Sequence, residues 1–152
     1  MSLENTTVLG LTRADDAADR VDAIEQIRAL TARGQRVLVV ASASPDQHRA
    51  GVLKANRMPV TADSYEVAGA MIEPDLLASA ALAGDLRDAG VAAVALDAGK
   101  LAPLTRGGAL DAEPRLIDAS ALSRALQRAR WLCCLVGSVA TSTGAGPRWA
   151  RA

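Results

Sequence analysis

The sequence is poor in aromatic residues and in the side chains that most often bind metals or act as nucleophiles. Among 152 residues it has no Phe, two Trp and one Tyr, and only one His and two Cys. A single His excludes a multi-histidine metal site. The scarcity of aromatic rings disfavours recognition of single-stranded nucleic acid by base stacking. The hydrophobic core must therefore be built from Leu, Val, Ile and the 33 Ala residues.

The chain also lacks an excess of charge of either sign. Seventeen basic and 17 acidic side chains give a formal net charge of zero, which argues against a nucleic-acid partner held by phosphate attraction. No apolar run approaches the roughly 20 residues of a membrane span. The first residues, MSLENTTVLG, lack the basic and apolar regions of a signal peptide. We therefore expect a cytoplasmic protein whose partners include neither nucleic acid nor a membrane.

What the chain does have is an alternation of strand and helix signals. Ala14–Arg33 carries apolar residues at steps of three and four, which predicts a helix, and Gly34 suits its C-terminal end. Apolar runs typical of buried parallel strands stand at Thr6–Leu11, Arg36–Ala41, Val91–Leu96 and Trp131–Val136. The pattern predicts an α/β fold, a three-layer sandwich with a mostly parallel central sheet, over residues 1–139. A Gly- and Pro-rich tail is expected over residues 140–152.

Further helices are predicted between these strands. Ser44 followed by Pro45 is typical of a helix start, here of a short helix. Ala62–Asp88 is Ala-rich and helical, but Pro74 interrupts it, which predicts two helices or a kink near Glu73.

The Gly- and Pro-rich stretch after the third strand predicts a hairpin. Its arms are expected at Leu101–Thr105 and Arg115–Ile117. A last helix is expected at Ser120–Ala129, ahead of the final strand.

Few residues stand out as candidates for chemistry. His48 lies in a polar stretch and is interpreted as a solvated surface residue. Cys133 and Cys134 are adjacent within a strand, so packing is favoured over a disulfide or catalysis.

Ser42 and Ser44 directly follow a predicted strand. Ligands of open α/β sheets bind beyond the carboxyl ends of strands, so this segment is the polar site best placed by topology. The alternative, that the serines only cap the next helix, remains open.

Three long segments carry a family resemblance. The segment DRVDAIEQIRALTARGQRVLVVASAS resembles the first long helix and Val-rich strand of the aspartokinases, in the amino acid kinase family, with Ser42 and Ala43 at the family's Ser-Ala pair. The segments ADSYEVAGAMIEPDLLASAALAGDLRDAGVAAVAL and PRLIDASALSRALQRARWLCCLVGSVA resemble later parts of the same catalytic domain. The resemblance runs from about Val8 to Val139 and covers the N-terminal half of that domain, which implies a truncated amino-acid-kinase-like fold.

The departures from the family concern its catalytic motifs. The family's Lys and Gly-Gly pair, which contact the transferring phosphoryl group, fall near Leu9 and near Leu11 and Thr12. The family's Gly-Glu, whose carboxylate helps to hold the amino acid, reads Gly69-Ala70. Phosphoryl transfer depends on positioned positive charge, so these differences imply a pseudoenzyme with no catalytic residue and no metal site.

The resemblance and the strand-end rule together imply a binding role. A small ligand is expected at Ser42, Ala43, Gly69, Gly137 and Ser138. The first alternative is an acceptor-side component of an amino acid kinase, which would use ATP and Mg²⁺. The second is a structural or assembly domain without a ligand. Unless the kinase alternative holds, no cofactor is expected.

The resemblance also bears on partners. Aspartokinase-like domains continue their sheet into a second half, so an open strand edge or an apolar helix face is expected here. Ala-rich stretches such as Ala68–Ala83 permit close helix approach, and two-fold pairing is the commonest way to cover such a surface. We therefore expect a homodimer, or a protein partner that supplies a second lobe.

Overall fold

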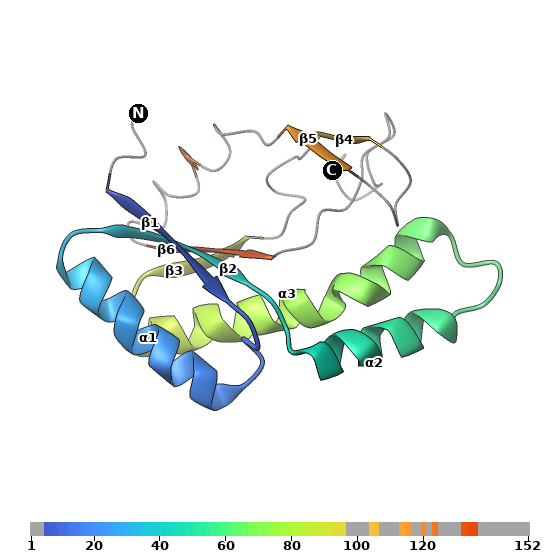
Figure 1. Cartoon of the computed structure of the whole chain (residues 1–152), viewed down its shortest axis with the longest axis horizontal. Coiled ribbons are helices and arrows are strands. Elements are labelled where there is room, and N and C mark those ends of the chain that lie inside the picture. Colours follow the sequence, from blue (N-terminus) through green and yellow to red (C-terminus); the bar gives the residue numbers. More distant parts are fainter. Residues whose placement is uncertain are drawn as a thin grey trace.

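The computed structural model describes residues 5–96, 104–106, 113–116, 120, 123–124 and 132–136. Along the first two thirds of the chain three strands are connected by helices, by α1 between the first two and by α2 and α3 between the second and third (Figure 1). They are β1 (Thr6–Leu11), α1 (Ala17–Ala32), β2 (Arg36–Ala41), α2 (Pro45–Asn56), α3 (Ser64–Asp88), β3 (Ala93–Leu96), β4 (Leu104–Arg106), β5 (Glu113–Leu116) and β6 (Leu132–Val136). The predicted α/β class is confirmed.

A four-stranded parallel sheet in the order β1-β2-β6-β3 forms the centre of the molecule. Val37 of β2 and Ala93 of β3 both pair with Leu132, so the last strand in sequence is an inner strand. A second sheet consists of β4 and β5, which pair antiparallel, and the predicted hairpin is thereby confirmed. Its predicted residues Leu101–Pro103 and Ile117 lie outside the described residues.

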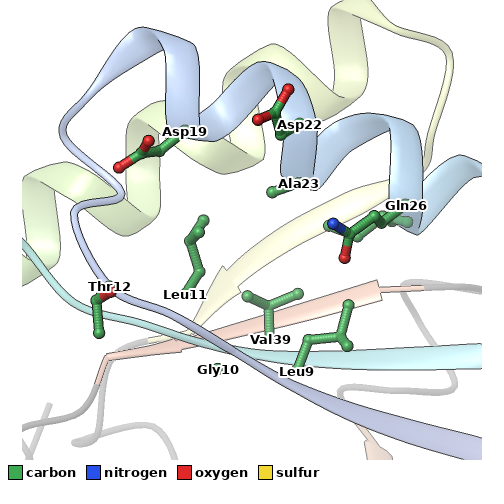
Figure 2. Close-up of a pocket in the computed structure, with 10 residues that line it drawn as sticks. Leu9, Gly10, Leu11, Thr12, Asp19, Asp22, Ala23, Gln26 and Val39 are labelled. Atoms are coloured by element: carbon green, nitrogen blue, oxygen red, sulfur yellow. The ribbon is translucent and has the colours of Figure 1, made fainter.

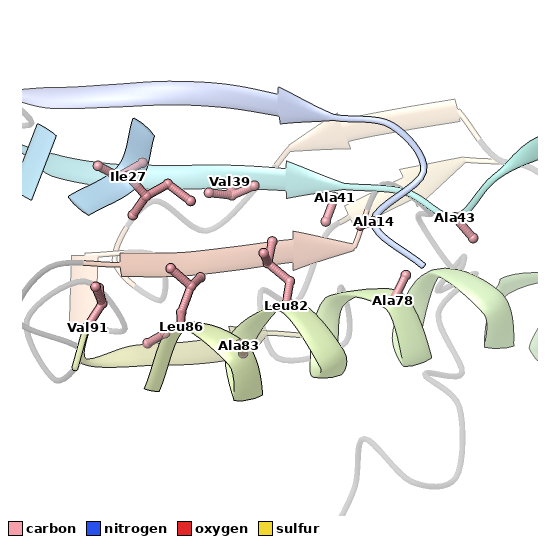
Figure 3. Packing of buried hydrophobic residues seen from close by; sticks show 12 residues of the cluster. Ala14, Ile27, Val39, Ala41, Ala43, Ala78, Leu82, Ala83, Leu86 and Val91 are labelled. Carbon is pink, nitrogen blue, oxygen red and sulfur yellow. The ribbon is translucent and has the colours of Figure 1, made fainter. Parts of the chain in front are cut away.

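The core lies between the central sheet and the helices α1 and α3. Ile27 of α1, Val39 of β2 and Leu86 of α3 are fully buried against one another on one face of the sheet (Figure 3). Each such side chain stabilises the fold by about 1.5–3 kcal/mol through removal of apolar area from water. The helix predicted at Ser120–Ala129 falls mostly outside the described residues, of which Ser120, Ser123 and Arg124 are helical.

Helix α1 has the ends that its sequence dictates. The Asp16 side chain accepts hydrogen bonds from the N–H groups of Ala18 and Asp19, so the helix begins after Asp16 rather than at Ala14. Gly34 follows the helix with φ +76°, a conformation that glycine adopts without strain.

Helices α2 and α3 form an antiparallel pair that extends past the sheet (Figure 1). The predicted start of α2 is confirmed, with Ser44 as the N-cap and Pro45 as the first helical residue. Helix α3 begins with a capping box between Asp63 and Glu66.

The expectation of two helices around Pro74 is wrong, because α3 is one helix of 25 residues with Pro74 inside it. Pro74 cannot donate a hydrogen bond to the carbonyl of Ala70, one turn earlier. Helix α2 packs closely at that point, since a Cβ on Gly51 would lie only 3.1 Å from the Ala70 carbonyl oxygen. Close packing of α2 at Pro74 therefore helps to keep α3 continuous in spite of the lost hydrogen bond.

By length and hydropathy alone, α3 would be able to cross a membrane. That is weak evidence, because the central helix of a folded domain passes the same test. Leu82, Ala83 and Leu86 of α3 are fully buried in the core against the sheet. The C-terminal half of α3 is therefore part of the core, whereas only 28% of the apolar stretch as a whole is buried.

Candidate functional site at the carboxyl edge of the sheet

The loops that follow β1 and β2 are joined to each other at the carboxyl ends of these strands. The Ser42 N–H donates to the Leu11 carbonyl at 2.9 Å, and the Ala14 N–H donates to the Ser42 carbonyl at 2.8 Å. We use the term carboxyl-edge cluster for Asp15, Ser42, Ala43, Ser44, His48 and Asp75, which are linked around this junction.

Asp75 is the buried member of the cluster, with 7% of its surface exposed. Its Oδ1 accepts the Ala43 N–H at 2.8 Å and lies 2.7 Å from His48 Nε2. A buried carboxylate is costly unless hydrogen bonds stabilise it, and these two partners supply them. In the neutral imidazole the proton lies on Nε2, because the facing atom is a carboxylate oxygen, and Nδ1 is then an acceptor. The arrangement ties α2, α3 and the end of β2 together.

Asp15 binds the other side of the same segment. Its carboxylate accepts both the backbone N–H and the hydroxyl of Ser44, the latter at 2.7 Å. Burial alone would raise the pKa of Asp15, but the hydrogen bonds from Ser44 outweigh it and hold that pKa below its usual value. Asp15 is therefore an ionised group that fixes the N-cap of α2.

The backbone donors of Ser42, Ala43 and Ser44 are consequently all occupied. One donates to a carbonyl and two donate to carboxylates, those of Asp75 and Asp15. An anion such as a phosphate needs free N–H groups or cations. This segment offers it no free N–H group.

The nearby arginines are occupied as well. Arg20 donates from Nε to Asp85 at 2.6 Å and from Nη1 to the carbonyls of Ala14 and Asp15. Arg13 pairs with Asp16 at 2.9 Å and with Asp19 at 3.3 Å. Neither arginine is therefore free to bind an anion at this edge of the sheet.

The predicted site residues are only partly brought together. Ser42 and Ala43 lie in the carboxyl-edge cluster, whereas Gly69 lies on an exposed part of α3, between the buried Ala68 and Ala70. Gly137 and Ser138 lie outside the described residues, so their place in a ligand site stays a prediction. Among the described residues no three His, Cys, Asp or Glu side chains lie where they could hold a metal ion.

Asp15 and Asp75 were not among the predicted site residues, and His48 is only in part the solvated surface residue that was expected, since 41% of its side chain is exposed. His48 is a helical residue paired with a buried carboxylate, not a freely solvated side chain. One signal was present in the sequence. Asp75 stands on the same helical stripe as Leu82 and Leu86, so a lone carboxylate within an apolar stripe indicated a buried partner.

A second feature lies at the outer strand, β1. An open cavity of about 310 Å³ separates β1 from α1 (Figure 2). Leu9, Leu11, Ala23, Ile27 and Val39 form its apolar wall, and Gly10, Thr12, Asp19, Asp22 and Gln26 complete the lining.

The comparisons with known proteins bear on the fold. No family model matches the chain, and no curated protein matches its sequence. Solved structures do match. Aspartokinase III of E. coli, in complex with aspartate and ADP, superposes with a TM-score of 0.66 over 87% of this chain and 40% of that protein, at 14% identity.

The chain has an aspartokinase-like fold. Aspartate kinase from Synechocystis matches with a TM-score of 0.64 over 90% of this chain and 22% of its own length, at 14% identity. The protein smu.665 of Streptococcus mutans UA159 matches with a TM-score of 0.64 over 91% of this chain and 60% of its own, at 15% identity. At these identities the similarity establishes the fold alone. The chain also spans less than two thirds of each of these three proteins.

Proposed function

We propose that this chain is a catalytically degenerate aspartokinase-like domain that acts by binding a partner. The observation that supports it best is the closed carboxyl-edge cluster. The N–H groups of Ser42, Ala43 and Ser44, which would be the natural anion donors at this edge, are already bonded within the chain.

The loop after β1 supports the same proposal. Where the aspartokinase family has a phosphoryl-contacting Lys and a Gly pair, this chain has Leu9 and Leu11, which are partly buried and pack against the core. The nearest cation, Arg13, is paired with two aspartates. Transfer of a phosphoryl group needs positive charge at the moving phosphate, and this loop supplies none that is free.

Between a small ligand and a protein partner, the geometry favours the protein. A small polar ligand that binds the N–H groups of Ala43 and Ser44 would have to displace Asp75 and Asp15 from their hydrogen bonds. Leaving the buried carboxylate of Asp75 unpaired would cost about 1–3 kcal/mol. A second copy of this chain, or a protein that supplies a second lobe, would bind without opening the cluster.

An assay of phosphoryl transfer tests the proposal. The purified protein is incubated with ATP, Mg²⁺ and aspartate, and ADP is measured against a heat-denatured blank. We expect no turnover above the blank. In parallel, thermal unfolding is followed with each compound, because a ligand at a hundred times its Kd stabilises a fold by about 2.7 kcal/mol. We expect no rise in Tm with ATP or aspartate.

ADP formation that increases with protein concentration would contradict the proposal and favour the acceptor-side kinase. Static light scattering tests the expected homodimer separately. A mass that stays at 15.7 kDa over a hundredfold concentration range would exclude the second copy as the partner.

A further inference from the structure

The outer edge of β1 has backbone groups that point away from the sheet. The Arg36 N–H donates to the Asn5 carbonyl, and the Ser42 N–H donates to the Leu11 carbonyl. Because backbone direction alternates along a strand, the odd-numbered residues of β1 face β2. The N–H and C=O groups of Thr6, Val8 and Gly10 therefore face outward. In the described part of the chain, β2 is the one strand that pairs with β1.

The sheet face away from α1 is open beside this edge, because Cβ atoms alternate along β1 and those of Val8 and Gly10 lie opposite to Leu9 and Leu11. A Cβ placed on Gly10 would meet nothing within 4 Å. Val8 is 61% exposed although it lies in the middle of a strand. An unpaired strand edge without a charge, a proline or a bulge to protect it is a template for pairing with another strand.

The cavity beside β1 adds a chemical preference to the edge. Its wall toward the core is apolar and includes Leu9 and Leu11 (Figure 2). Its outer part is lined by Asp19, Asp22 and Gln26 of α1. Asp19 is paired with Arg13, whereas Asp22 is exposed and makes no ion pair with a described residue.

We propose that the outer edge of β1 binds an extended strand of a partner protein that carries Lys or Arg at the positions over this cavity. The partner's backbone pairs with Thr6, Val8 and Gly10. The aliphatic stem of its basic side chain covers the apolar wall, and the cation lies at Asp22. This inference rests on the proposed binding role and specifies the chemistry of the partner.

The same charges disfavour a second copy at this edge. The strand β1 itself, TTVLGL, has no Lys or Arg, so two-fold pairing with β1 of another copy would place no β1 cation at Asp22. An interface that leaves a charge unmatched selects against that partner. A basic strand has the complementary charge.

Model strands test the proposal directly. The probes are blocked peptides in which Val alternates with Lys, with Glu or with Thr, and binding to the full chain is measured by fluorescence anisotropy at low salt. We expect the Val–Lys peptide to bind at least tenfold more tightly than the Val–Glu peptide. Hydrogen exchange followed by NMR should show new protection of the Val8 and Gly10 amides, whereas the Leu9 amide, already bonded to β2, stays unchanged.

Paired variants separate the backbone contribution from the charge. Gly10→Pro removes an outward N–H and should lower the affinity for the Val–Lys peptide about tenfold. Gly10→Ala keeps that N–H and should change the affinity by no more than about threefold. Asp22→Asn should lower the affinity for the Val–Lys peptide about fivefold and leave the affinity for the Val–Thr peptide unchanged. Glu25→Gln, an equal change of charge on the same helix outside the cavity lining, should have little effect on any peptide.

Three results would overturn the proposal: equal binding of the Val–Lys and Val–Glu peptides, absence of binding, or binding without protection of Val8 and Gly10. A dimer that Gly10→Pro converts to a monomer would also overturn it, because the occupant would then be a second copy. If these peptides do not bind and no ADP forms, the inference of a basic strand is contradicted and the proposed function is not. ADP formation contradicts the proposed function whatever the peptides do.

Discussion

The junction after β2 and the outer edge of β1 treat backbone hydrogen-bonding groups in opposite ways. After β2, the N–H groups of Ser42, Ala43 and Ser44 all have acceptors within the chain. Along β1, the N–H and C=O groups of Thr6, Val8 and Gly10 point away from β2, which among the described residues is the strand that pairs with β1. The comparison teaches that position at the carboxyl end of a sheet does not by itself make a ligand site. Capacity to bind remains where folding has left polar groups unpaired.

The strongest test of the closed junction is Asp75→Ala. The substitution leaves the buried Ala43 N–H without an acceptor and His48 without its partner, so we expect a loss of about 3 kcal/mol in the free energy of unfolding. Urea denaturation at pH 7 measures it. His48→Ala is the matched control and should cost about 1 kcal/mol, because the His48 side chain is 41% exposed. Equal losses for the two variants would show that the bond to Ala43 contributes nothing.

Asp15→Asn tests the second carboxylate and its charge. At pH 7 we expect a loss of about 1 kcal/mol, because the amide keeps the shape of the side chain but not the charge-assisted hydrogen bonds from Ser44. The pKa of Asp15 is lowered in the folded state. Its stabilisation is therefore complete above the unfolded-state pKa of about 3.9 and is lost as the pH falls through the lower, folded-state pKa.

The difference between the wild type and Asp15→Asn should thus disappear in acid. Denaturation curves between pH 7 and pH 2 follow it, with Glu25→Gln as a control at an exposed position of α1. A difference that stays constant over this range would show that shape, and not charge, is what Asp15 contributes.

The smallest effect is expected at the open edge. Gly10→Ala should change the free energy of unfolding by no more than about 0.5 kcal/mol, since the added Cβ meets nothing within 4 Å. Gly51→Ala is the matched contrast and should cost about 1 kcal/mol, because its Cβ would crowd the Ala70 carbonyl at 3.1 Å. Thermal unfolding of both variants measures these changes. A cost at Gly10 as large as that at Gly51 would mean that the face of β1 away from α1 is already covered.

The sequence was sufficient to predict the local elements. The bounds of β1 and β2 agree with the predicted Thr6–Leu11 and Arg36–Ala41, because short continuous apolar runs ended by polar residues leave little choice. Pro74 misled the prediction because packing against α2, which local propensity does not describe, keeps α3 continuous.

The carboxyl-edge cluster was predictable only in part. The position of Ser42 and Ser44 at a strand end follows from topology, and both lie in the cluster. The carboxylates that accept hydrogen bonds from Ala43 and Ser44, those of Asp75 and Asp15, lie far away in the sequence, and no short-range pattern pairs them with this segment. Which hydrogen bonds close a site depends on how α3 packs across the end of β2, and that is a property of the tertiary structure.

The place of β6 in the sheet has a consequence for how the chain folds. Val37 of β2 and Ala93 of β3 both pair with Leu132, so the β1–β2 pair and β3 cannot join into one sheet until β6 is available. Such long-range parallel pairing requires large loops to close before it is rewarded, which makes folding slow. Until then the inner edges of β2 and β3 are exposed and prone to aggregate. Synthesis from the N-terminus therefore delays completion of the sheet until almost the whole described chain has been made.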